Sequence, residues 1–353
     1  MSVRPLGRTG RPHRFLAVVF VALSALTTAC GAIGDQSAEA SVGAPVLKIG
    51  LPTGVTSFAN ADIIVAKEKG FLADYGVAVE LENFRSGVSV VQGVVDGDID
   101  VGASSIEPVV NAAGGGGDVV IIGASSDRLA VSAVTSTDIK LPADLRGRQL
   151  GVQEVGAFRE VMTRLVLQQG GLTPNDVQYV PVDAQSYTAA LVDGRIQSAI
   201  LQTEQAVAAS HAYPNLHVLA NLFDIMPDYH YGTFFVSRSW LEANRETASR
   251  LLTALVKAHR YMYDNKQETV RIVANATGFD ESIIDESYDV LLTQRQIFPL
   301  NTGLDADRIS ATVESMGELG ILQNDAPEID RLLDTGPADD AIKQLGARAG
   351  SRR

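Results

Sequence analysis

Apolar and polar residues alternate along the chain in short runs typical of β-strands, and segments typical of helices separate these runs. The first strands are predicted at Val46–Leu51, Val77–Phe84 and Ile99–Ala103. A helix capped by Thr56 or Ser57 and running to about Lys69 is predicted between the first two, and a second helix from Val88 to Val95 follows. Strands that alternate with helices favour βαβ units and a parallel sheet. The pattern therefore predicts an α/β protein.

Part of this pattern recurs later in the chain. Val94–Ser105 (VVDGDIDVGASS) resembles Leu191–Gln202 (LVDGRIQSAILQ), and both predict a helix end, Asp-Gly, a strand and a polar loop. The glycine is expected to adopt the left-handed conformation after the helix. Coincidence is the alternative, because helix–glycine–strand is common in α/β proteins. Together with matching upstream elements, the pattern favours two similar lobes.

The lobes are expected to be joined by two chain crossings. The strand Ala130–Ser136 is predicted to leave the first lobe, and Thr233–Val236 to return the chain to it. This places 46–136 and 233–345 in a discontinuous first lobe, 137–232 in a second lobe, and 346–353 in a loose basic tail. Two crossings make a natural hinge.

The N-terminal residues predict export. Four arginines and no acid stand among the first fourteen residues, and the apolar run Phe15–Leu26 follows. This is typical of a secretory signal, and the run is too short to span a bilayer. Cys30 follows after the three small residues Thr27–Ala29, as in a bacterial lipobox, although Thr27 stands where leucine is usual. We expect a signal peptide over 1–29, lipidation of Cys30 and a tether over 30–45; an incidental signal-peptide cysteine is the alternative.

Composition narrows the possible functions. The chain has 353 residues, 46% of them hydrophobic, and a net charge of -13. The apolar fraction excludes a disordered chain, and the negative charge argues against nucleic-acid binding. One cysteine excludes an intramolecular disulfide and a multi-cysteine metal site, and no cofactor or metal is expected. His211 and His217 show no zinc spacing, and Gly114–Gly117 are expected to connect a helix to a strand rather than to bind phosphate.

Three segments indicate a family. Ala66–Leu81 (AKEKGFLADYGVAVEL), Gly93–Ser105 and Leu141–Val152 (LPADLRGRQLGV) resemble the solute-binding proteins of nitrate, sulfonate and taurine uptake systems, a family that includes thiamine-pyrimidine precursor binders. The resemblance implies a hinged, two-lobed periplasmic-binding-protein-like fold (type II), with a parallel-rich sheet flanked by helices in each lobe.

The same resemblance implies a function. Such a protein closes on a small solute outside the cell membrane, or in the periplasm, and delivers it to the permease and ATPase subunits of an ABC importer. A monomer is expected. A sensor that binds solute and docks on a membrane receptor is an alternative. A pyrimidine-synthesising enzyme shares the fold, but it depends on a cysteine-rich motif that this chain lacks, so no enzymatic activity is expected.

Ligands of α/β sheets bind beyond the carboxyl ends of the strands, where helix N-termini can hold anions. Candidate ligand-binding residues are those in the loops predicted there and beside the return strand: Ser57, Phe58, Arg85, Ser86, Ser104, Ser105, Glu154, Phe158, Gln202, Glu204, Tyr229 and Tyr231.

Each candidate also has a structural interpretation. The serines can cap helices or satisfy loops, the aromatic rings can pack within the protein, and Arg85 can form a solvated ion pair. Glu107, Glu154 and Glu204 would repel an anion unless protonated. They can point to water, or accept hydrogen bonds from an amino or ring N–H group. The ligand class, anion or nitrogenous heterocycle, is therefore left open.

Overall fold

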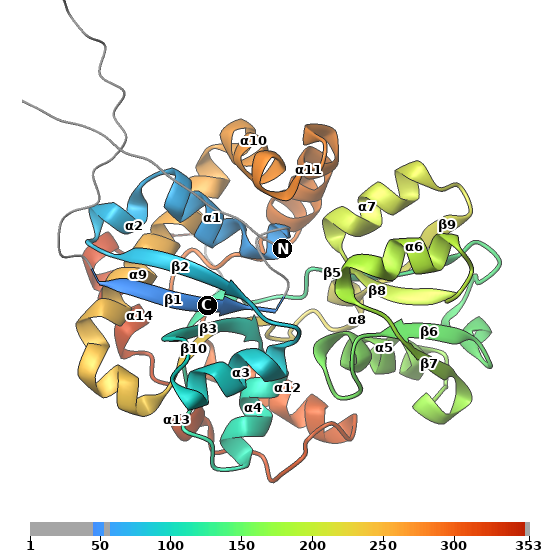
Figure 1. Ribbon diagram of the computed structural model, residues 1–353, viewed down its shortest axis with the longest axis horizontal. Helices are drawn as coiled ribbons and strands as arrows, with labels where there is room; N and C mark the ends of the chain where they lie inside the picture. Colours follow the sequence, from blue (N-terminus) through green and yellow to red (C-terminus); the bar gives the residue numbers. More distant parts are fainter. Residues whose placement is uncertain (1–44, 53–56, 350–353) are drawn as a thin grey trace, which may run out of the picture. The chain divides into compact units, whose positions relative to one another are not determined.

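The computed structural model describes residues 45–52 and 57–349, so the predictions for the signal peptide and Cys30 lie outside the described residues. The strands form two five-stranded sheets, in the orders β2-β1-β3-β10-β4 and β7-β6-β8-β5-β9 (Figure 1). The first sheet contains β1 (Val46–Leu51), β2 (Ala78–Asn83), β3 (Val101–Ser105), β4 (Val120–Ser126) and β10 (Gly232–Val236). The second contains β5 (Val131–Ser136), β6 (Gln149–Val152), β7 (Gln178–Pro181), β8 (Ser198–Gln202) and β9 (Leu216–Asn221).

Helices flank both sheets. Those of the first sheet's lobe are α1 (Ala61–Glu68), α2 (Phe71–Asp74), α3 (Gly87–Asp96), α4 (Ile106–Gly114), α9 (Arg238–Asp264), α10 (Lys266–Thr277), α11 (Glu281–Tyr288), α12 (Ala306–Glu318), α13 (Ile329–Leu332) and α14 (Gly336–Leu345). Those of the second are α5 (Phe158–Gln169), α6 (Tyr187–Val192), α7 (Thr203–Ala212) and α8 (Leu222–Ile225). Short 3-10 turns precede α1 (η1, Phe58–Asn60) and other elements, and a π-helix (η5, Asp289–Gln294) continues α11.

Each sheet is mainly parallel, and one antiparallel strand lies inside it. In the first sheet this strand is β10, which runs antiparallel to β3 and β4; in the second it is β5, antiparallel to β8 and β9. Each antiparallel strand directly follows a crossing from the other sheet. The two sheets therefore share one topology, which confirms the predicted two-lobed α/β architecture.

The predicted position of the first chain crossing between the lobes is wrong. The segment Ala130–Ser136 was expected to belong to the first lobe, but β5 pairs on both edges within the second sheet. The chain thus crosses before this strand, at residues 127–130. The local pattern shows that the segment is a strand, but it does not show which strands pair with it.

The internal repeat is visible in backbone geometry. Gly97 follows α3 with φ 76° and leads to β3, and Gly194 follows α6 with φ 70° and leads to β8. Both glycines have the left-handed conformation that the Asp-Gly pattern predicts. Glu107 and Glu204 occupy the same place in the repeat, one residue after Ile106 in α4 and after Thr203 in α7.

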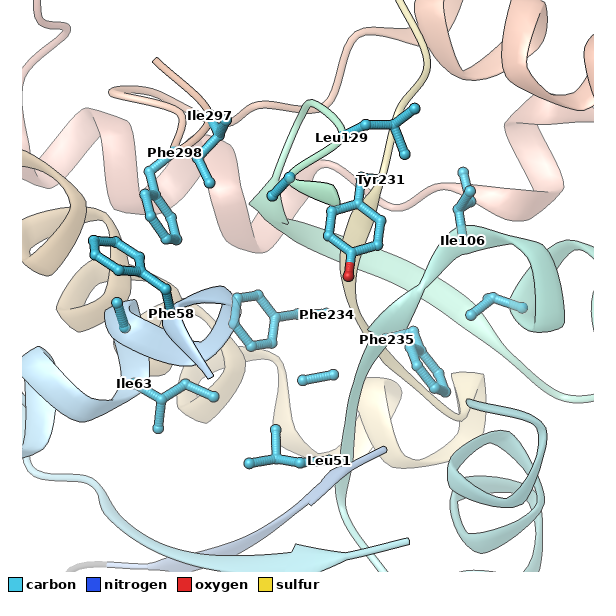
Figure 2. Packing of buried hydrophobic residues seen from close by; sticks show 14 of the residues in the cluster. Leu51, Phe58, Ile63, Ile106, Leu129, Tyr231, Phe234, Phe235, Ile297 and Phe298 are labelled. Carbon is cyan, nitrogen blue, oxygen red and sulfur yellow. The ribbon is translucent and has the colours of Figure 1, made fainter. Parts of the chain in front are cut away.

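The core of the first lobe lies on both faces of β10. Phe234 and Phe235 are fully buried and point to opposite faces, as successive strand residues do (Figure 2). A Cβ at Gly102, on the neighbouring β3, would lie 2.1 Å from the Phe235 ring. Glycine at this position therefore allows the phenyl ring to cross the adjacent strand.

The two histidines without zinc spacing and part of the C-terminal segment have defined positions in the structure. His211 lies in α7 with Nε2 2.9 Å from a Glu286 carboxylate oxygen, and His217 lies in β9. The segment 346–353 was predicted to be a loose tail. In the structure Arg348, within this segment, donates a 2.9 Å hydrogen bond to Asp264 in α9. Within the described residues, no helix combines the length and apolar character needed to cross a membrane.

Candidate functional site

A cavity of about 60 Å³ lies between the carboxyl ends of strands from both sheets, and we call it the interlobe cavity. Its lining residues come from both lobes: Pro52, Ala59, Asn60, Ser86, Gly87, Ala103, Ser104, Ser105, Ser125, Gln153, Ala157, Phe158, Arg159, Gln202, Tyr231 and Gly232. Six of the predicted ligand-binding residues are among them: Ser86, Ser104, Ser105, Phe158, Gln202 and Tyr231. The cavity thus lies at the strand ends where the sequence places the site.

Two aromatic rings form one wall of the interlobe cavity. Phe158, at the start of α5, stacks on Tyr231 with 4.7 Å between ring centroids. Gln202 Nε2 donates a 3.3 Å hydrogen bond to the Tyr231 hydroxyl. Burial raises the pKa of Tyr231 to about 12, so the phenol is neutral at physiological pH. This wall offers a flat apolar surface with polar groups at its edge.

The serines of the first lobe make hydrogen bonds within the protein and also line the interlobe cavity. Ser86 caps α3: its Oγ accepts from the Ser89 backbone N–H, and its own N–H donates to Ser89 Oγ at 3.0 Å. Ser104 Oγ donates to the Ser105 carbonyl at 3.0 Å. The structural interpretation made from the sequence is confirmed for these hydroxyls, and the ligand-binding interpretation stays a prediction for serines that also line the cavity.

Arg159 is the lining residue with a positive charge, and the sequence analysis missed it. Its side chain is almost fully buried, donates to the Ile200 carbonyl, and lies 4.8 Å from the centre of the Tyr187 ring. Among the described residues it forms no ion pair with a carboxylate. Burial lowers the pKa of Arg159, because charge is costly away from water. Its place one residue after Phe158 at a helix start was the available signal.

Glu204 joins the two lobes. From the first turn of α7 it accepts hydrogen bonds from Ser57 Oγ at 2.9 Å and from the Phe58 backbone N–H at 3.2 Å. Ser57 Oγ also accepts from the Ala59 N–H, so it caps η1 as predicted. Glu204 is 1% exposed, and burial raises its pKa. None of Ser57, Phe58 and Glu204 lines the interlobe cavity.

Glu107, the repeat counterpart of Glu204, is buried in the first lobe. Its Oε1 accepts a 2.7 Å hydrogen bond from the Tyr229 hydroxyl, and burial raises the pKa of both groups. Its Oε2 has no hydrogen-bond partner among the described residues. The interpretation that these acids point to water is therefore wrong for Glu107 and Glu204. Tyr229 does not line the cavity.

The remaining candidates lie on the surface. Arg85 and Glu154 form an ion pair of 4.0 Å between the lobes, with side chains 80% and 40% exposed. Neither lines the cavity. Such exposed pairs contribute little to stability, because water and salt screen them. Among the described residues, no cluster of three or more side chains is suited to hold a metal ion.

Two five-stranded α/β lobes, linked by two crossings and enclosing a cavity at their strand ends, define the bilobed fold of the periplasmic-binding-protein type. The chain belongs to the NMT1/THI5-like family, whose profile matches residues 57–269.

Among its relatives is a putative binding protein from Brucella abortus (strain 2308), which is 25% identical over 224 residues, covering 63% of this chain and 69% of the relative. A putative aliphatic sulfonates-binding protein from Escherichia coli (strain K12) is 22% identical over 213 residues, covering 58% and 64%.

Solved structures share the fold. The chain is similar to a Bordetella bronchiseptica RB50 protein with a TM-score of 0.73 and 18% identity, covering 85% of this chain and 98% of that one. For the nitrate-binding protein of Synechocystis PCC 6803 the TM-score is 0.72, with 17% identity and coverages of 86% and 90%. For the aliphatic sulphonate binding protein of Escherichia coli it is 0.65, with 19% identity and coverages of 82% and 92%.

Proposed function

We propose that this protein is the exported solute-binding component of an ABC importer, and that it captures a small organic solute in the interlobe cavity and delivers it to the permease. The observation that supports this most directly is the cavity itself, which residues of both lobes line at the strand ends. The relatives add support, since they include proteins described as binding aliphatic sulfonates and nitrate.

The geometry suggests how binding is coupled to lobe movement. Ser86, Ser104 and Ser105 come from the first lobe, whereas Phe158, Arg159 and Gln202 come from the second. A ligand can contact both sets only when the lobes approach each other. It therefore binds the closed arrangement better and shifts the population toward it. The permease would then recognise the closed arrangement, and no catalytic step is part of this proposal.

Arg159 and the aromatic wall are the groups expected to select the solute. A buried arginine that has no carboxylate partner among the described residues favours a ligand with an anionic group, and the Phe158–Tyr231 pair favours an apolar or flat body. Sulfonates, nitrate-like anions and acidic heterocycles fulfil the first condition. The hydroxyl and amide groups around the cavity can hydrogen-bond to the rest of the ligand.

A thermal-shift screen tests this function, because a ligand that binds the folded state raises its melting temperature. The panel contains sulfonates, nitrate, carboxylates and pyrimidines. A ligand that stabilises the wild type is expected to bind Phe158→Ala and Arg159→Gln at least about tenfold more weakly, which corresponds to about 1.4 kcal/mol. Leu141→Ala, an exposed change in the second lobe, is the control and should bind normally. Equal affinity of all variants would contradict the proposed site.

We also propose that Cys30 is lipidated and anchors the protein to the outer face of the cell membrane. Mass spectrometry of the membrane fraction should find an acylated N-terminal cysteine in the wild type, and Cys30→Ala should be released into the soluble fraction. Equal membrane retention of both proteins without added acyl mass would exclude the anchor.

A further inference from the structure

A second pocket, which we call the crossover pocket, lies beside residues 127–130, where the chain first crosses between the sheets. Its volume is about 310 Å³, and Arg128, Gln296, Phe298, Thr302, Leu304 and Arg308 are among its lining residues. None of its lining residues lines the interlobe cavity. It is therefore a separate feature, built from the crossing, the segment after the π-helix and the start of α12.

Arg128 has unused hydrogen-bonding capacity in this pocket. Its side chain is 17% exposed, and its buried Nε, 3.6 Å from Asp127 Oδ1, has no hydrogen-bond partner in the part of the chain that the structure describes. Among the described residues its guanidinium donates only one long bond, of 3.5 Å, to the Arg295 carbonyl. Unpaired buried donors are costly, and an oxyanion is the acceptor that a guanidinium holds best.

Arg308 places a second guanidinium at the same pocket. Its Nη1 donates a 3.1 Å hydrogen bond to the Asp127 carbonyl in the first crossing. Its Nη2 lies 3.7 Å from an Asp228 carboxylate oxygen in the second crossing, where Asp228 is 81% exposed. The side chain is thus fixed between both crossings, while its carboxylate partner is largely in water and weakly attractive.

Two acids, Asp127 and Asp305, line the pocket beside these arginines. Asp305 is engaged as the N-cap of α12, because its Oδ1 accepts from the backbone N–H groups of Asp307 and Arg308. Burial raises the pKa of Asp127, and its Oδ1 accepts no hydrogen bond among the described residues. A ligand oxyanion would therefore meet two guanidinium groups beside the Asp127 carboxyl group, whose pKa burial raises.

The rest of the pocket has apolar walls, and one lining residue, Gln296, has an unusual backbone conformation. Phe298 and Leu304 provide apolar walls, and Thr302 provides a hydroxyl. Gln296 has φ 51°, and among the described residues no other non-glycine has a positive φ. The π-helix Asp289–Gln294 ends just before it. Such costly backbone features persist mainly at functional sites.

We propose that the crossover pocket binds a small organic acid, whose carboxylate or sulfonate pairs with Arg128 and Arg308 while a short alkyl body packs on Phe298 and Leu304. The volume lies at the lower end of the range for small-molecule sites, about 300 Å³ and above. Because Arg308 contacts both crossings, the bound acid would touch the segments that link the lobes. The inference is independent of the proposed transport function, which depends on the other cavity.

Calorimetric titration of the full chain with hexanoate, hexanesulfonate and neutral hexanol tests the proposal. At least one of the two acids should bind, and hexanol should bind at least tenfold more weakly. Arg128→Gln should weaken acid binding at this pocket at least tenfold, Arg128→Lys less, and Arg195→Gln, at an exposed arginine of the second lobe that lines neither cavity, should leave it unchanged. No binding of either acid, equal binding of hexanol, or a loss in Arg159→Gln with none in Arg128→Gln would overturn the proposal.

A crystal grown with a bromine-labelled hexanoate gives a readout that needs no variant. The anomalous bromine signal is expected beside Phe298 and Leu304. A signal confined to the interlobe cavity would overturn the inference while supporting the proposed solute-binding function, so the two proposals fail separately.

Discussion

The carboxylate of Glu204 accepts a 2.9 Å hydrogen bond from the hydroxyl of Ser57, which lies 147 residues earlier and in the other lobe. The Glu204 carboxylate thus lies at the N-terminus of η1, the first helical turn of the first lobe. The sequence analysis expected an anionic ligand at such a helix N-terminus. An anionic solute in the interlobe cavity is therefore expected to pair with Arg159 instead.

The first prediction concerns this contact between the lobes. Glu204→Ala should lower the free energy of unfolding by about 1–3 kcal/mol, because the Phe58 N–H loses its acceptor in a buried position. Glu204→Gln should cost less, since the amide oxygen can still accept. Glu154→Ala removes an exposed pair between the same lobes and should change stability by about 0.5 kcal/mol or less. Urea unfolding measures all three, and equal losses for Glu154→Ala and Glu204→Ala would contradict the prediction.

The second prediction uses the repeat. Gly97→Ala and Gly194→Ala should each destabilise the protein by about 1 kcal/mol, because both positions have φ near 70° and a Cβ disfavours that conformation. No atom lies within 4 Å of either added Cβ, so backbone conformation is the sole expected cost. Gly317→Ala, inside α12 with ordinary helical φ, should be neutral or stabilising. Thermal unfolding is the measurement, and clearly unequal losses at Gly97 and Gly194 would argue against equivalent turns.

The third prediction concerns acid stability. His230 is fully buried without ring hydrogen bonds among the described residues, and burial lowers its pKa to about 3, with the positive charge of Arg308 acting in the same direction and Asp305 opposing it. The unfolded chain binds a proton near pH 6.5, whereas the folded protein does not until about pH 3. Between these values His230 should reduce the free energy of unfolding by about 1.4 kcal/mol per pH unit as the pH falls.

His230→Leu isolates this effect. Its stability relative to the wild type should be constant above pH 7 and improve progressively below pH 6.5. Glu107 and Glu204 have raised pKa values and act in the opposite direction, losing stability as the pH rises above their unfolded range. They are present in both proteins, so their contribution cancels in the difference. A stability difference independent of pH from 7 to 4 would refute the assignment.

The fourth prediction concerns the aromatic wall. Tyr231→Phe removes the hydroxyl that accepts from Gln202 Nε2, which leaves a buried amide N–H with one partner fewer. We expect a loss of about 0.5–1.5 kcal/mol in the free energy of unfolding, with the stacking on Phe158 retained. Differential scanning calorimetry measures it. A gain in stability would show that this hydrogen bond does not contribute in the folded protein.

Local sequence determined much of the chain. The strand Val46–Leu51 has the predicted bounds, Ser57 caps the first helical turn as one of the two predicted caps, and Gly97 and Gly194 have the predicted turn conformation. These features depend on alternation of side chains, on one hydroxyl near one N–H, or on one residue's φ, so a few neighbouring residues decide them. The positions of the loops at the strand ends follow from the same local order.

Only the tertiary structure decided which distant groups meet. The sequence shows that Val131–Ser136 is a strand, but long-range pairing places it between β8 and β9. The sequence shows an acid at Glu204, but packing of the lobes buries it against Ser57 and leaves Arg159 to line the cavity. Side-chain partners separated by many residues depend on how sheets and helices pack in space, and no local pattern of residues records that.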